Sequence, residues 1–230
     1  MSVSIVDEDM PSLEATSFTT QQLRRGVILL AAIVVMRAVL VGMFWAQPDP
    51  ATDPFGFGLL VLVAFLVGSV GLVYFGFTRW VGVDLKAWWI DPDELRGDLL
   101  WGVVGVVVVF VVLGVFALVM MVGLGMEPPE QVPPSAVGFA LILVFGFAVR
   151  AFQEETLFRG FLQTAFENRV GPWQANVLQA FVFAIAHIGY IPLSEWPMYI
   201  LVFVLGLVFG GLRMRRGRLL APAIAHGFGA

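Results

Sequence analysis

The stretch that decides the fold is FQEETLFR, residues 152–159, which follows a long apolar run. It places two adjacent carboxylates, Glu154 and Glu155, and the cation Arg159 at the end of a segment long enough to cross a membrane. Burying one charge in hydrocarbon costs about 3 kcal/mol or more, so ionisable residues inside membrane segments indicate functional sites. We therefore expect the rest of the chain to be arranged around these charges.

The composition is that of a membrane protein. Of 230 residues, 59% are hydrophobic and 13% are charged, and the mean hydropathy is +0.90. A soluble domain has about a quarter of its residues charged. The chain has no cysteine, which excludes disulfides, a thiolate nucleophile and a thiolate metal site. The formal net charge of −4 is less informative than the positions of the charges.

Seven apolar runs predict an all-α, polytopic transmembrane helix bundle. A helix needs about 20 apolar residues to cross a ~30 Å hydrocarbon core. We expect spans at residues 26–46, 56–78, 99–122, 136–158, 173–190, 198–212 and 219–230. The last run would rise only about 18 Å, so we expect an incomplete seventh span. Residues 1–25 are interpreted as a flexible cytoplasmic tail, and residues 26–230 as the transmembrane domain.

The lysines and arginines predict the orientation of these spans. All of them except Arg37 fall in alternate segments, and none lies in residues 47–55, 123–135 or 191–197. This pattern predicts a multi-pass protein with a cytoplasmic N-terminus. Arg37 lies inside the first span without an evident partner, and we expect either a buried ion pair or a side chain that extends toward the interface.

Two smaller features also predict structure. Three tryptophans in the charged segment 79–98 predict a short amphipathic helix at the cytoplasmic interface. Gly206 and Gly210 predict close packing between two helices.

A helical hairpin should bring acid and base residues to the same height. Residues 136–169 predict one long helix, and a glycine–proline pair at Gly171 ends it and begins the next. Glu155 lies 16 residues before Gly171, and His187 lies 16 residues after it. In an antiparallel hairpin, these equal counts predict a hydrogen bond between His187 and a glutamate; Glu154 satisfies the same count within one residue.

The two glutamates should have different roles, because neighbours on an α-helix diverge by about 100°. Glu155 and Arg159 have the spacing of an intrahelical ion pair, which would leave Glu154 free to face a cavity. We expect Glu154 and His187 to polarise a water molecule. His226, on the last helix, would donate to the oxyanion formed when that water attacks a carbonyl.

Each of these residues also has a simpler interpretation. The charges at 152–159 could form an interfacial salt bridge, His187 could be a satisfied core histidine, and His226 could lie at the interface. Phe183, one turn before His187, is expected to serve in packing. The similar depths predicted for the three acid–base groups favour a common catalytic site.

These residues also resemble a known family. EExxxR at 154–159, FxxxH at 183–187 and His226 shortly after LLAP at 219–222 are similar to the three motifs of the CPBP family. That family contains the type II CAAX prenyl endopeptidases and the bacterial ABI, bacteriocin-processing proteins. The resemblance covers about residues 95–230. The family usually has Asn four residues after the last histidine, where this chain has Ala230.

The resemblance implies an intramembrane bundle, usually of eight helices, in a prokaryotic plasma membrane. It implies that Glu154 and His187 activate water and that His226 binds the oxyanion, with Glu155, Arg159 and Phe183 in support. The expected partners are membrane lipid and a peptide or lipidated-peptide substrate, with no nucleic acid.

Several functions stay open from the sequence. The leading hypothesis is an endopeptidase that cleaves near the cytoplasmic membrane face, in CAAX-type processing or in bacteriocin or peptide maturation. The alternatives are a non-catalytic immunity or scaffold protein of the same fold and a proton-coupled carrier. No cofactor is expected. A zinc metalloendopeptidase is the alternative mechanism, with Glu155, His187 and His226 as ligands, although the chain has no HExxH motif.

Overall fold

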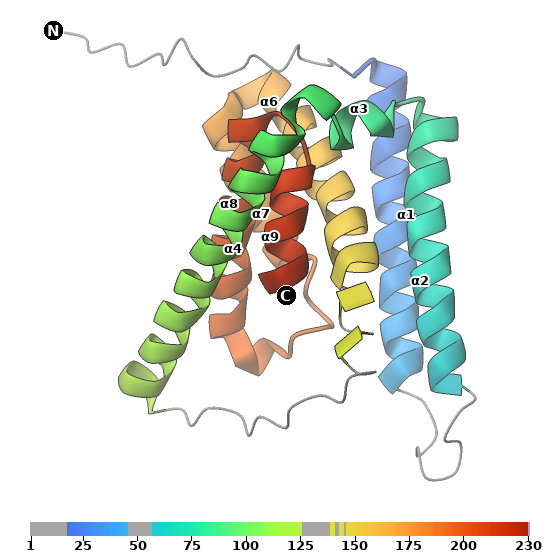
Figure 1. Cartoon of the computed structure of the whole chain (residues 1–230). Coiled ribbons are helices and arrows are strands. Elements are labelled where there is room, and N and C mark those ends of the chain that lie inside the picture. Colours follow the sequence, from blue (N-terminus) through green and yellow to red (C-terminus); the bar gives the residue numbers. More distant parts are fainter. Residues whose placement is uncertain (1–17, 46–56, 126–138, 141–142, 145, 230) are drawn as a thin grey trace, which may run out of the picture.

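The computed structural model describes residues 18–45, 57–125, 139–140, 143–144 and 146–229. Every named element within these ranges is helical, which confirms the all-α prediction (Figure 1). Several predicted segments lie outside the described residues. They are residues 1–17 of the predicted tail, all of 47–55, most of 123–135, the start of the predicted 136–158 span, and Ala230.

A helix is present at each predicted apolar run. The longer elements are α1 (Thr20–Trp45), α2 (Phe57–Phe75), α4 (Leu95–Leu118), η4 (Gly146–Gln163), α7 (Pro172–Ile185), α8 (Trp196–Arg216) and α9 (Leu220–Gly229). η1 (Gly76–Val81) continues α2, η3 (Val119–Gly123) continues α4, and α6 (Thr164–Val170) continues η4.

Two helical segments of the described chain are long and apolar enough to cross a membrane. They are Leu85–Gly123 and Leu193–Arg216. The first segment leaves large apolar side chains exposed along its length, including Val103, Phe110 and Val122. Exposed apolar side chains at this density suit a lipid environment better than water. Membrane crossing by the other helices stays a prediction.

The predicted break between the two hairpin helices is confirmed. Gly171 has φ +88°, ends α6 and directly precedes Pro172 in the first turn of α7. Only glycine adopts such a backbone conformation readily. The predicted extension of the second helix to residue 190 is wrong, because α7 ends at Ile185 and a turn follows. In that turn Gly189 has φ +96°, and the amides of Tyr190 and Ile191 both donate to the carbonyl of His187.

The bundle has two apolar clusters with η4 between them. One joins α1, α2 and η1 to η4 through residues such as Ile33, Phe77 and Phe161. The other joins α4, α8 and α9 through Val109, Phe209 and neighbouring residues. As a result α9 lies inside the bundle, packed against α4, α8 and η4 (Figure 1). This packing carries His226 from the last helix to the centre of the molecule.

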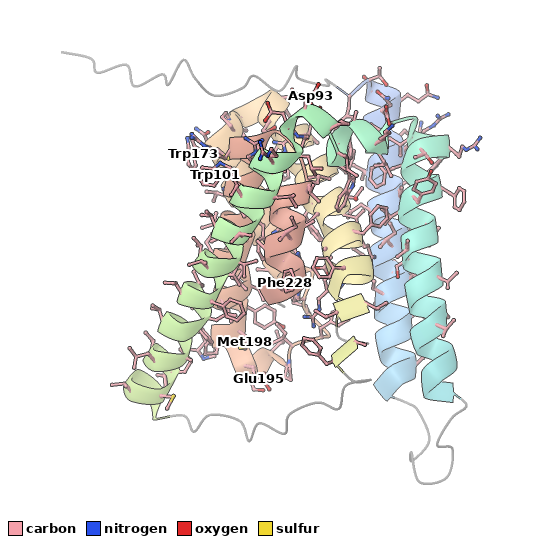
Figure 2. All side chains as sticks on the ribbon, viewed as in Figure 1. Asp93, Trp101, Trp173, Glu195, Met198 and Phe228 are labelled. Atoms are coloured by element: carbon pink, nitrogen blue, oxygen red, sulfur yellow. The ribbon has the colours of Figure 1, made fainter. Side chains whose placement is uncertain are left out.

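The cation-rich segments lie together at one end of the bundle. The predicted amphipathic helix is present as α3 (Leu85–Trp89), followed by η2 (Pro92–Glu94). The carbonyl of Trp88 accepts a hydrogen bond from the amide of Leu219, at the start of α9. Buried Asp98, in the first turn of α4, accepts from Arg216 at 2.8 Å and from Arg218 at 2.9 Å. These contacts fix the α8–α9 connection against the start of α4, near the labelled Asp93 in Figure 2.

The predicted close packing at Gly206 and Gly210 is present between α7 and α8. A Cβ atom at Gly206 would lie 3.0 Å from the Cα atom of Ala180, and one at Gly210 would overlap the side-chain oxygen of Asn176. A Cβ atom at Gly211 would meet nothing within 4 Å. Neighbouring glycines on one helix therefore differ sharply in the space around them.

This difference predicts opposite effects of two adjacent alanine substitutions. We expect Gly210→Ala to lower stability by about 1–3 kcal/mol, because polar side chains of α7 must move. Gly211→Ala should be neutral or stabilising by up to about 1 kcal/mol, because alanine favours the helix. Thermal unfolding midpoints of the purified variants in one detergent provide the measurement. Equal midpoints for the two variants would contradict the described packing.

Candidate active site

The helix that carries the two glutamates is wider than an α-helix. η4 is wound as a π-helix, in which backbone hydrogen bonds join residues five apart. Its wider turn separates neighbouring side chains by less than the ~100° of an α-helix. Short π segments inside helices are frequent at functional sites. The two glutamates can therefore approach one partner, although only Glu154 lines the cavity described below.

Both glutamates meet at His226. Its Nδ1 lies 2.7 Å from Glu155 Oε1, and its Nε2 lies 3.6 Å from Glu154 Oε2. Glu155 Oε1 also accepts from Arg159 Nη1 at 3.1 Å, so the predicted intrahelical pair is present. The ring of His226 stacks on Phe209, with centroids 4.5 Å apart. Each ring nitrogen of His226 thus has a carboxylate near it, and one face of the ring packs on Phe209.

The tautomer of His226 follows from these contacts. A carboxylate without a proton can only accept, so Nδ1 carries the hydrogen that is donated to Glu155. In the neutral ring, Nε2 is then an acceptor directed toward Glu154. Nε2 becomes a donor only when the ring is protonated.

Arg37 is the partner of Glu154, and the sequence did not predict it. Arg37 Nη2 lies 2.7 Å from Glu154 Oε1, and Arg37 Nε donates to the hydroxyl of Tyr190 at 2.9 Å. The side chains of Arg37 and Glu154 are 10% and 3% exposed. Of the two expectations for Arg37, the buried ion pair is confirmed and extension to the interface is wrong. The signal in the sequence was a cation within an apolar run, with nothing to indicate its partner.

His187 lies in the turn after α7 instead of within a helix. Its Nδ1 donates to the carbonyl of Phe183 at 2.8 Å, which leaves Nε2 as an acceptor in the neutral ring. The predicted hydrogen bond between His187 and a glutamate is not formed among the described residues. The same turn also places Tyr190 beside Arg37. It therefore positions both the base His187 and the hydroxyl that accepts a hydrogen bond from Arg37.

Phe183 lies between the charged groups of the site. Its ring is edge-on to His187 with centroids 4.8 Å apart and edge-on to His226 at 5.9 Å. The guanidinium carbon of Arg159 lies 4.2 Å from the Phe183 centroid. This contact stabilises the buried cation electrostatically and separates it from the cavity described next.

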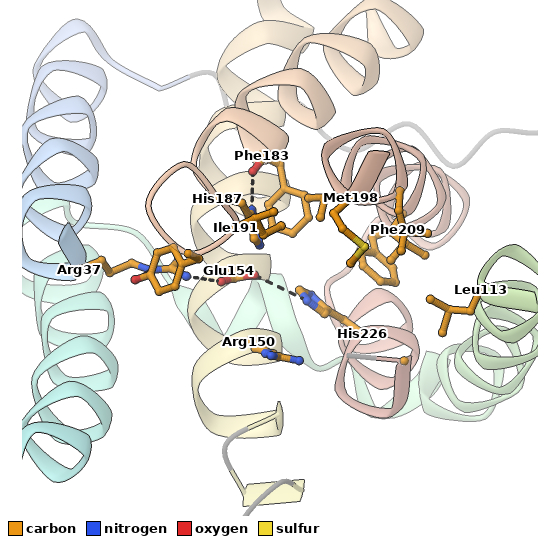
Figure 3. Close-up of a pocket in the computed structure, with 15 residues that line it drawn as sticks. Arg37, Leu113, Arg150, Glu154, Phe183, His187, Ile191, Met198, Phe209 and His226 are labelled. Atoms are coloured by element: carbon orange, nitrogen blue, oxygen red, sulfur yellow. Dashed lines mark hydrogen bonds and ion pairs between the residues drawn. The ribbon is translucent and has the colours of Figure 1, made fainter. Parts of the chain in front are cut away.

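A cavity of about 520 Å³ brings the predicted residues together. Such a volume is typical of a site for a small molecule or a short peptide segment. Its polar lining consists of Arg37, Arg150, Glu154, His187, Tyr190 and His226, and most of its other lining is apolar (Figure 3). Glu155 and Arg159 do not line it. The cavity thus sets an acid–base centre beside an apolar wall.

The alternative zinc ligands are not arranged as a metal site. Among the described residues, no group of three or more His, Asp or Glu side chains is placed so that it could hold a metal ion. Glu155 is paired with Arg159 and lies off the cavity. Zinc binding by Glu155, His187 and His226 therefore stays a prediction, with Glu155 outside the cavity that the two histidines line.

Residues 136–229 match the family model described as type II CAAX prenyl endopeptidase Rce1-like. The match includes all three motifs from which the resemblance was inferred, and it confirms that resemblance for this segment. Proteins of this family are membrane-embedded proteases, so the match supports an endopeptidase activity.

Two bacterial proteins are similar to this chain. It is 29% identical over 168 residues to uncharacterized protein YpbD of Bacillus subtilis (strain 168), an alignment that covers 72% of this chain and 79% of that protein. It is 30% identical over 154 residues to an uncharacterized 24.3 kDa protein of Escherichia coli, with 60% and 66% coverage respectively. Neither name states an activity. No solved structure matches the chain.

Proposed function

We propose that this protein is an intramembrane endopeptidase that hydrolyses a peptide bond with water activated by Glu154 and His187. The observation that carries the proposal is the cavity on which the Glu154 carboxylate, the His187 ring and the His226 ring all lie. The family match supports protease chemistry for the segment that holds these three residues.

The two proton acceptors can act on one water molecule. Glu154 is a carboxylate, and the Nε2 atom of His187 is left as an acceptor by the Nδ1 bond to Phe183. General-base removal of a proton from water contributes typically 10²–10⁴-fold to a rate. The water oxygen forms a bond to the carbonyl carbon, the carbon–nitrogen bond breaks, and the abstracted proton passes to the leaving amine.

His226 is proposed to stabilise the oxyanion in its protonated form. Its Nδ1–H bond to Glu155 means that only the imidazolium has a second N–H, at Nε2, to donate. Arg159 balances part of the charge of Glu155. One donor to an oxyanion is worth about 10²–10³ in rate.

Arg37 is proposed to position Glu154. The ion pair favours the ionised carboxylate and fixes Oε1, while Oε2 stays directed toward His226. Tyr190 fixes the other edge of the guanidinium. Arg37 would therefore hold the general base in the charge state and orientation that proton abstraction requires.

The apolar wall of the cavity supports a hydrophobic or lipidated peptide as the substrate. Leu201, Val202 and Leu205 of α8 line the cavity together with the polar residues. Both CAAX-type processing and maturation of a bacteriocin or other peptide fit this chemistry. His226 lies six residues after the start of α9, about 9 Å from the cation-rich end along the helix axis. With that end in the cytoplasm, as the distribution of lysine and arginine predicts, cleavage occurs in the cytoplasmic half of a multi-pass protein.

A reconstituted cleavage assay tests this proposal together with its metal independence. The purified chain, stripped of metal by chelation, is placed in liposomes with a farnesylated CAAX-type peptide or, in parallel, with unmodified apolar peptides. We expect new peptide termini, detected by mass spectrometry, at a rate that chelation leaves unchanged. Loss of cleavage on chelation and recovery with zinc would reject the metal-free mechanism. Absence of cleavage in both substrate arms would favour a non-catalytic membrane protein.

A further inference from the structure

A row of buried polar side chains leads away from His226 toward the cation-rich end of the bundle. Four of its residues are spaced by four along η4 and α6, and two more face them from α7. We call this set the polar row: Glu155, Arg159, Gln163, Glu167, Asn176 and Gln179. Its inner end is the bond between Glu155 and His226. At its outer end Glu167, with its side chain 15% exposed, pairs with Arg213.

The glycines of α8 let these side chains reach the backbone. The carbonyl of Gly206 accepts from Gln179 Nε2 at 2.9 Å and from Arg159 Nη2 at 3.5 Å. The carbonyl of Gly210 accepts from Gln163 Nε2 at 3.4 Å. Most side-chain N–H donors of the row thus bond to backbone carbonyls of α8.

The acceptors of the row are not satisfied in the same way. Three buried acceptor atoms of the row have no hydrogen-bond partner among the described residues: Glu155 Oε2, Gln163 Oε1 and Gln179 Oε1. One buried donor of the row, Arg159 Nε, is also without a partner there. Outside the row, the side-chain amide of Gln153 is also without a partner there. Each unsatisfied group would cost about 1–3 kcal/mol. Four such atoms lie on residues of this one row, where η4, α7 and α8 meet.

The chemistry of these atoms selects the ligand. Three carbonyl or carboxylate oxygens require a donor, which excludes an anion, and the guanidinium of Arg159 disfavours a metal cation. Water donates and accepts, and buried water typically makes about three hydrogen bonds to polar groups that lack protein partners.

We propose that the polar row is a buried water-binding site that connects the Glu167 end of the bundle with His226. It supplies the hydrolytic water while the peptide fills the cavity, a role that rests on the proposed endopeptidase function. The cavity itself is walled mainly by apolar side chains, so the row gives water a separate polar route from the cation-rich end.

Single cysteines test this proposal cleanly, because the chain has none of its own. Gln163→Cys and Gln179→Cys place a thiol in the row. Phe161→Cys and Ala180→Cys place one at fully buried neighbouring positions outside it. The rate of thiol modification by silver ion is measured in each folded protein in detergent. A thiol in apolar surroundings is inert, so we expect the row cysteines to react at least about tenfold faster than the controls.

Equal rates at row and control positions would overturn the proposal. As a second measurement, Gln163→Met and Gln179→Met replace an amide by an apolar side chain of similar length. We expect each to lower kcat by about tenfold with KM unchanged, since the supply of water affects the chemical step and not substrate binding. An unchanged kcat in both would overturn the supply role. If the wild type cleaves nothing, the silver rates still decide whether the row is hydrated.

Discussion

Glu154→Gln is expected to reduce peptide cleavage by about 10²–10⁴-fold while leaving the protein folded. Glutamine has nearly the same shape, and its side-chain oxygen can still accept the 2.7 Å bond from Arg37. It cannot take a proton from water at neutral pH. The loss should therefore appear in kcat, with the thermal midpoint close to that of the wild type.

Glu94→Gln is the matched control for that variant. Glu94 is also a carboxylate paired with an arginine, at 2.7 Å from Arg216, but it lies at the end of the bundle and does not line the cavity. We expect its cleavage rate to equal that of the wild type. Initial rates of both variants in the same liposomes make the comparison. A Glu154→Gln protein that cleaves as fast as Glu94→Gln would remove Glu154 from the mechanism.

Arg159→Met is expected to cause the largest loss of stability, about 3–5 kcal/mol. Both side chains of the Arg159–Glu155 pair are fully buried, so removing the cation leaves Glu155 as a poorly compensated charge in the core. The variant also loses the contacts of the guanidinium with the Phe183 and Phe209 rings, at 4.2 and 5.2 Å from their centroids. The measurement is the thermal midpoint of the purified protein in detergent.

Removing the partner charge should restore part of that stability. In the double variant Glu155→Gln with Arg159→Met, neither buried charge remains, so we expect a midpoint above that of Arg159→Met alone. The four proteins form a double-mutant cycle whose interaction term reports the pair. A cycle with no interaction term, or an Arg159→Met protein as stable as the wild type, would show that the pair does not hold this part of the core.

The helices could be predicted because hydropathy and helix breakers are local signals. A run such as 99–122 predicts a helix by its length and composition alone, and Gly171 marks the hairpin through a conformation that side chains disfavour. The end of α7 was missed because the turn after Ile185 is apolar and continues the hydropathy of the helix. Its signals were Gly189 and Pro192.

The grouping of the site residues could be predicted, but their hydrogen bonds could not. Counting from Gly171 brought His187 to the level of the glutamates, and all three predicted residues line the cavity. Counting residues from Gly171 did not show that Arg37, 117 positions before Glu154, forms an ion pair with that carboxylate. A single chain contains no signal that pairs one buried cation with one of two adjacent acids.

The π winding of η4 was also beyond the sequence. A hydrogen-bond shift from residue i+4 to residue i+5 has no characteristic composition, so an α-helical angle was assumed for the two glutamates. The structure places both carboxylates at His226, which changed the role of Glu155 from a partner of Arg159 alone to a partner of the histidine as well.

The most direct test of the account is the origin of the oxygen in the product. Peptide cleavage by the reconstituted protein is carried out in ¹⁸O-labelled water, and the new carboxyl terminus is analysed by mass spectrometry. We predict that the wild type incorporates label from water at the rate of cleavage and that Glu154→Gln incorporates none above background. Incorporation by Glu154→Gln at the wild-type rate would contradict water activation by this carboxylate.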